Sequence, residues 1–189
     1  RDDVESRGLG DVYKRQTFLI ADYYIPHSRL YLGCASVLVL VGALDDRFDI
    51  SVKIRAAVQA FIAIIMIVMG KLYLSSLGYI FGAWEMQLGP FGYLLTLFAV
   101  WAAINAFNMG DGIDGLLGGL SSVSFAAIGI ILWLDGQTSI AMWCFAMIAA
   151  TLPYILLNLG ALGRRYKVFM GDAGSTFIGF TVIWILLET

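Results

Sequence analysis

Long apolar runs alternate with short polar stretches along most of this chain. The runs occupy residues 28–44, 56–69, 91–107, 116–134, 139–158 and 173–187. A helix needs about 17–25 apolar residues to cross the hydrocarbon core of a bilayer, and several of these runs approach or reach that length. The pattern therefore predicts an all-α fold, a polytopic integral membrane helical bundle that lies in the lipid bilayer.

Composition supports a membrane protein and excludes several other classes. Hydrophobic residues make up 60% of the chain and charged residues 14%, whereas soluble domains have about 45–50% and about 25%. The net charge of −2, without a basic tract, indicates no nucleic-acid partner. Cys34 and Cys144 lie singly inside apolar runs, so they form no zinc or redox motif.

The two ends of the chain differ from its middle. Residues 1–16 carry mixed charge and no apolar stripe, and composition changes abruptly at Thr17. We expect residues 1–16 to be foreign to the fold. The chain lacks an initiator Met and stops directly after an apolar run. We therefore expect a fragment of a larger multi-span protein.

Three acidic loops interrupt the apolar runs, at residues 44–49, 105–115 and 166–175. Two runs separate the first loop from the second, and two more separate the second from the third. An even number of crossings returns the chain to the same side, so all three loops should face one compartment. Most Lys and Arg residues outside 1–16 lie on that side, which predicts that the loops are cytoplasmic.

The aspartates of these loops are candidates for metal and phosphate chemistry. Charge at a membrane interface is costly and therefore often functional. Mg²⁺ takes oxygen ligands, usually one or two carboxylates plus substrate phosphates. Asp111 and Asp114 are three residues apart and would share one face if the turn continued into the following helix. The plainer alternative is a set of solvated loop acids with ordinary positive-inside bases.

Two short motif matches lead to different conclusions. Residues 110–115 fit G-x-G-x-x-G, but no strand precedes them and their two aspartates would repel a pyrophosphate, so we reject a dinucleotide site. Residues 45–49 fit D-D-x-x-D, so a Mg-dependent membrane prenyltransferase is an alternative function. A cation-coupled transporter is another, although interfacial carboxylates count against it. His27 is the only histidine, and we expect it on the side opposite the acidic loops, where it cannot act beside their aspartates. This excludes a Ser-His-Asp triad.

Residues 45–55, 108–116 and 163–175 resemble the polyprenyl-phosphate N-acetylhexosamine-1-phosphate transferases, especially their enterobacterial members. The resemblance covers residues 17–189 and implies a partial membrane transferase domain. It implies transfer of N-acetylglucosamine 1-phosphate from UDP-N-acetylglucosamine to undecaprenyl phosphate with release of UMP. It further implies Mg²⁺, or Mn²⁺, as cofactor, the bacterial inner membrane as location, and a role in O-antigen and enterobacterial common antigen synthesis.

The resemblance also implies roles for individual residues. Asp114 and Asp172 would bind the metal, Asp45 or Asp46 would deprotonate or orient the lipid phosphate, and Asp111 would shape the nucleotide site. The implied substrate-binding residues are Asn108, Lys53, Arg55, Asn158, Arg164, Arg165 and Lys167. Gly110 stands where the family usually has a bulkier residue, which we expect to loosen the turn. The oligomeric state is left open, with a homodimer as one arrangement to consider.

Overall fold

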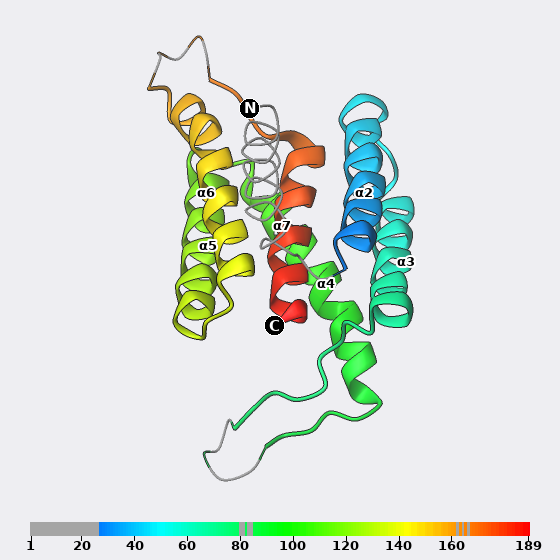
Figure 1. Cartoon of the computed structure of the whole chain (residues 1–189). Coiled ribbons are helices and arrows are strands. Elements are labelled where there is room, and N and C mark those ends of the chain that lie inside the picture. Colours follow the sequence, from blue (N-terminus) through cyan, green and yellow to red (C-terminus); the bar gives the residue numbers. More distant parts are fainter. Residues whose placement is uncertain (1–26, 80–81, 83–84, 162, 164, 166) are drawn as a thin grey trace, which may run out of the picture.

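Six helices joined at alternating ends form the described part of the chain (Figure 1). This computed structural model describes residues 27–79, 82, 85–161, 163, 165 and 167–189. The helices are α2 (Ser28–Phe48), α3 (Val52–Gly70), α4 (Phe91–Gly110), α5 (Leu116–Leu134), α6 (Thr138–Asn158) and α7 (Gly171–Glu188). Extended pairing within these residues is limited to one antiparallel bridge between Ser76 and Gln87. The predicted all-α fold is confirmed.

The helices α2 to α6 are each long and apolar enough to cross a membrane. Their most apolar 18-residue windows have mean hydropathies between 1.4 and 2.1. The helix α7 is not among these five and is instead buried along most of its length. It lies between α2 on one side and the α5–α6 pair on the other, and it crosses α4 (Figure 1). The prediction of a polytopic membrane bundle is confirmed, with α7 at its centre.

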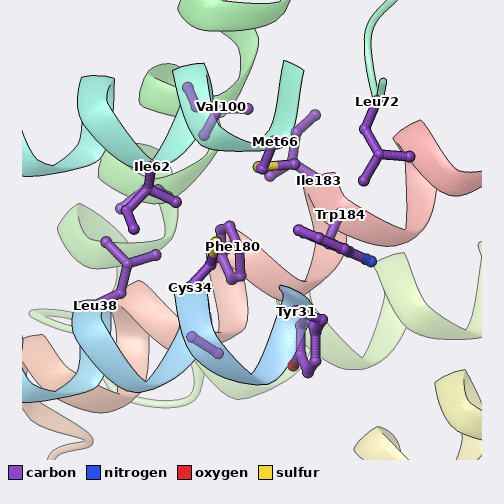
Figure 2. Packing of buried hydrophobic residues seen from close by; sticks show 13 residues of the cluster. Tyr31, Cys34, Leu38, Ile62, Met66, Leu72, Val100, Phe180, Ile183 and Trp184 are labelled. Carbon is purple, nitrogen blue, oxygen red and sulfur yellow. The ribbon is translucent and has the colours of Figure 1, made fainter. Parts of the chain in front are cut away.

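Aromatic side chains of α7 form the centre of one part of the core. Phe180 and Trp184 pack against Tyr31 of α2, with ring centroids 5.9 and 5.4 Å apart (Figure 2). Met66 of α3 and Val100 of α4 complete the same cluster and are fully buried. These contacts fix α7 against three helices, because buried side chains of this size fill the space between them.

Glycines allow two helices to approach α7 closely. A Cβ atom added to Gly42 of α2 would lie 2.5 Å from the Cα of Ala173, and one added to Gly179 would lie 2.9 Å from the Cα of Ile104. Small residues at such crossings are typical of membrane helix packing. The Gly42 crossing places the end of α2 directly beside the first turn of α7.

The first acidic loop is shorter than expected. We predicted that the helix would end at Leu44, but α2 continues to Phe48, and α3 begins at Val52. The loop is therefore Asp49 to Ser51, and the backbone of Asp49, at φ 52°, ends α2. The prediction was wrong because a helix end can carry charged residues once it reaches the membrane surface.

The helix ends that flank the acidic loops all lie at one end of the bundle, the upper end in Figure 1. The connection between α3 and α4 lies at the opposite end. The crossing argument is therefore confirmed: the described parts of the three acidic loops share one side. We call this side the polar end.

Candidate active site at the polar end

A carboxylate pair bridged by one arginine lies at the centre of the polar end. Arg55 of α3 forms an ion pair with Asp45 of α2, and its Nη1 also lies 3.0 Å from Oδ2 of Asp172 of α7. Asp45 is buried and accepts a hydrogen bond from the Ile50 N–H at 2.7 Å. Asp172 accepts one from Asn108 Nδ2 at 2.6 Å. We call Asp45, Arg55, Asp172 and Asn108 the central cluster.

The arginine makes this arrangement electrostatically feasible. Two carboxylates held close together repel each other unless a cation or a proton compensates. Here the guanidinium of Arg55 contacts both Asp45 and Asp172. Its side chain is 27% exposed and that of Asp45 only 3%, so water screens the pair weakly. The cluster keeps one net negative charge and is suited to attract a cation.

The central cluster lines a narrow cleft among α2, α3, α4 and α7. Its polar wall includes Gln59 and Asn105, whose side chains are joined by a 2.8 Å hydrogen bond from Asn105 Nδ2 to Gln59 Oε1. Its apolar lining residues include Leu38, Val41 and Val58. The volume of about 20 Å³ is enough for one water molecule.

Asp46 and Asp111 bind the backbone of α7 instead. Asp46 accepts hydrogen bonds from the N–H groups of Asp172 and Ala173, at 2.7 and 3.3 Å. Asp111 accepts them from Met170 and Gly171, at 3.2 and 2.8 Å. Negative charge at a helix N-terminus is stabilising, because the free N–H groups carry partial positive charge. Both aspartates therefore stabilise the start of α7.

Asp111 and Asp114 point to different partners. Asp111 is buried and also accepts a 2.8 Å hydrogen bond from the Tyr154 hydroxyl. Asp114 is 53% exposed and forms an ion pair with Lys167. A shared face required the turn to continue into the following helix, but Gly115, at φ 75°, separates both residues from the helix that begins at Leu116. They consequently lie in a turn.

Asn158 links the second and third acidic loops. It is fully buried, and its Oδ1 accepts a 2.6 Å hydrogen bond from the Gly115 N–H. Its Nδ2 donates to the carbonyl of Val168 at 2.8 Å. Buried polar groups need such partners. The structure therefore gives this predicted substrate residue a place inside the protein, where it ties the two loops together.

The other predicted residues are exposed or lie outside the described residues. Lys53, on the first turn of α3, and Arg165 are exposed. Arg164 lies outside the described residues. Gly110 is the last residue of α4, and a Cβ added there would meet nothing within 4 Å. A bulkier side chain would therefore fit at this position.

The predicted metal pair, Asp114 and Asp172, stays a prediction, and its two carboxylates have different ion-pair partners. Within the described residues, no three His, Cys, Asp or Glu side chains lie close enough to hold a metal ion. Asp114 contacts Lys167, whereas Asp172 meets Asp45 through Arg55. Asp45 and Asp172 are therefore the carboxylates best placed to share a cation.

Sequence reasoning missed three polar residues that support the site. Gln59 and Asn105 line the cleft, and Tyr154 holds Asp111. Each is a polar side chain inside an otherwise apolar run. Such residues usually face the interior of a membrane bundle, and that signal could have identified them.

Comparison with known proteins identifies the family of this chain. Residues 28–189 match the family model of glycosyl transferase family 4. A protein of Escherichia coli K12 named undecaprenyl-phosphate alpha-N-acetylglucosaminyl 1-phosphate transferase is 83% identical over 173 residues, which are 92% of this chain and 47% of that protein. Proteins of the same name from Yersinia pestis and Haemophilus influenzae are 74% and 61% identical, over 90% and 84% of this chain and 47% and 45% of those proteins.

The chain thus spans about half the length of the curated relatives that it matches. The matched region contains α2 to α7 and all residues of the central cluster. The chain belongs to glycosyl transferase family 4.

Proposed function

We propose that the protein to which this chain belongs transfers N-acetylglucosamine 1-phosphate from UDP-N-acetylglucosamine to undecaprenyl phosphate. The products are undecaprenyl-pyrophosphoryl-N-acetylglucosamine and UMP. The observation that carries the proposal is the central cluster, in which one arginine joins the buried Asp45 to the half-buried Asp172 at the membrane-surface end of an apolar bundle. The family and the names of the relatives support the two substrates.

The polar end suits the lipid acceptor. Arg55 can bind the lipid phosphate, because a guanidinium binds phosphate oxygens strongly, and the apolar helices below it suit the prenyl chain. In the reaction, an oxygen of the lipid phosphate forms a bond to the phosphorus that carries the sugar. The bond from that phosphorus to the bridging oxygen breaks, and UMP leaves with that oxygen. Asp45, buried beside Arg55, would orient the attacking phosphate or accept its proton.

The donor set of the cluster fits Mg²⁺ or Mn²⁺. Asp45 and Asp172 offer carboxylate oxygens within reach of one cationic group, Arg55 Nη1. Mg²⁺ is commonly held by one or two carboxylates, with substrate phosphates and water as its other ligands. A bound ion would neutralise charge on the diphosphate. Positioning and charge neutralisation account for most of the catalysis in phosphoryl transfer.

The exposed pair of Asp114 and Lys167 would contact the sugar nucleotide, with Arg165 and Lys53 as further bases at the rim. Asn158 would hold the two loops that carry this pair.

We further propose that the protein resides in the bacterial inner membrane with the polar end in the cytoplasm, because that end carries most of the Lys and Arg residues. The product would then serve O-antigen and enterobacterial common antigen synthesis.

The test is a transfer assay with the full-length protein in purified membranes. Radiolabelled UDP-N-acetylglucosamine and undecaprenyl phosphate are supplied with Mg²⁺, and UMP and labelled lipid are measured. We expect both products in equal amounts. Chelation with EDTA should abolish them, and Mg²⁺ or Mn²⁺ should restore them. UMP release that does not depend on the lipid phosphate would contradict the proposed acceptor.

The assay also separates the alternative functions. A prenyltransferase would require the D-D-x-x-D residues to act together, but Asp45 faces the cleft and Asp46 faces the backbone of α7. Transfer to an added prenyl acceptor without UMP release would favour that alternative. No contact among the described residues favours a cation-coupled transporter, so we do not propose one.

A further inference from the structure

Two carboxylates from other helices close the N-terminus of α7. An α-helix leaves its first four N–H groups without partners inside the helix. Here the N–H groups of residues 170–173 all donate to carboxylate oxygens, two to Asp111 and two to Asp46. Asp46 comes from the last turn of α2, and Asp111 directly follows α4. We call this set of four hydrogen bonds the α7 clamp.

The clamp residues are turned away from the cleft. Asp45 and Asp172 line the cleft, whereas Asp46 and Asp111 are not among its lining residues. Both oxygens of each clamp carboxylate accept backbone N–H groups. The adjacent acids Asp45 and Asp46 thus have different partners: Asp45 contacts Arg55, and Asp46 contacts the backbone of α7.

Asp172 connects the clamp to the central cluster. Its N–H donates to Asp46, while its carboxylate contacts Arg55 and Asn108. The backbone beside it is shaped for this contact. Gly171 has φ 74°, and a Cβ atom there would lie 2.8 Å from Oδ2 of Asp46. Holding the backbone at this point therefore fixes where the Asp172 carboxylate lies.

We propose that Asp46 and Asp111 are positioning residues, which hold the first turn of α7 so that Asp172 meets Asp45 and Arg55. The proposal rests on the proposed transferase function, and it assigns to these two acids a role other than proton transfer or metal binding. Asp46 and Asp111 would raise the rate of transfer only indirectly, because they fix the position of the Asp172 carboxylate.

Substitutions at Asp46 separate this role from direct catalysis. Asparagine keeps one acceptor oxygen, so it can hold one of the two N–H groups that Asp46 binds, whereas alanine holds neither. Asparagine cannot act as a base. In the full-length protein, Asp46→Asn should keep kcat within about threefold, and Asp46→Ala should lose about tenfold. KM for UDP-N-acetylglucosamine should stay within about twofold in both, because neither substitution alters the rim of the site. Asp45→Asn should lose at least about 100-fold.

Asp49→Asn is the matched control, because Asp49 is an exposed acid at the end of the same helix and lies outside the cleft lining. It should leave kcat unchanged. An Asp46→Asn variant as inactive as Asp45→Asn would overturn the proposal. Asp46→Asn alone decides the outcome if Asp46→Ala does not accumulate in membranes.

Hydrogen–deuterium exchange tests the clamp without any activity. The amides of residues 172 and 173 in the purified full-length protein should exchange faster in Asp46→Ala than in the wild type, because Asp46 holds both. They should exchange at an intermediate rate in Asp46→Asn and at the wild-type rate in Asp49→Asn. Equal exchange in Asp46→Ala and the wild type would overturn the clamp. A wild-type protein that releases no UMP would instead refute the proposed function, while the exchange data would still decide whether the clamp exists.

Discussion

Replacing Gly42 with alanine should push the end of α2 away from the first turn of α7. The added Cβ would lie 2.5 Å from the Cα of Ala173 and 2.9 Å from the carbonyl carbon of Asp172. Both are backbone atoms, so no side chain can rotate to relieve the contact. Ordinary contact begins near 3.4 Å, so the two helices must separate by about 1 Å.

This shift has a structural and an energetic consequence. The hydrogen bond from Ala173 N–H to Asp46 is already 3.3 Å long, and a further shift of about 1 Å would break it. Overpacking of this kind costs about 1–3 kcal/mol. Alanine also favours the helix over glycine by about 0.5–1 kcal/mol, so Gly42→Ala alone would understate the cost of the clash.

Gly33→Ala provides the matched control. Gly33 lies in the same helix, and a Cβ atom there meets nothing within 4 Å. It has the same helix preference without the clash. The difference between the two variants should therefore be about 1–3 kcal/mol in the free energy of unfolding.

The assay is thermal unfolding of the full-length protein in detergent, together with kcat in membranes. Gly42→Ala should melt a few degrees below Gly33→Ala and turn over more slowly, because Asp172 is displaced. Equal melting temperatures and equal kcat values would refute the close approach of α2 and α7.

Three further predictions test other parts of the structure. Asn158→Ala should lower the melting temperature, because it removes the hydrogen bonds to the part-buried Gly115 N–H and Val168 carbonyl, worth about 0.5–1.5 kcal/mol each; an unchanged melting temperature would contradict this. Lys167→Met should raise KM for UDP-N-acetylglucosamine about three- to tenfold with little change in kcat, because it removes a rim cation and frees Asp114; steady-state kinetics would show an unchanged KM if the pair lies outside the nucleotide site. Ser51→Cys should react with an impermeant thiol reagent only from the cytoplasm and Ser75→Cys only from the other side, since both serines are exposed and the native cysteines are buried; labelling of both from one side would refute the topology.

The sequence was sufficient to predict the side on which the acidic loops gather. Apolar runs of membrane-spanning length can be counted directly. An even number of crossings between two loops places both loops on the same side of the membrane. The all-α bundle followed from the same pattern. The exact helix ends did not, because Asp45 and Asp46 extend α2 at a position where a change in polarity suggested a loop.

The partner of each aspartate could not be predicted from the sequence. Asp45 and Asp46 are neighbours, yet one binds Arg55 and the other binds the backbone of α7. Their separation depends on the rotation of α2 about its axis, which the packing of Gly42 against Ala173 sets. Contacts between helices far apart in the sequence decide this, and no local pattern encodes them.

The most direct test of the central claim is UMP release by membranes that contain the full-length protein with Asp172→Asn. Asp172 belongs to both the central cluster and the α7 clamp, and asparagine preserves its size but removes its charge. We predict release at background level with a normal amount of inserted protein, while Asp49→Asn matches the wild type. Release within about tenfold of the wild type would contradict a transferase site built around Asp45, Arg55 and Asp172.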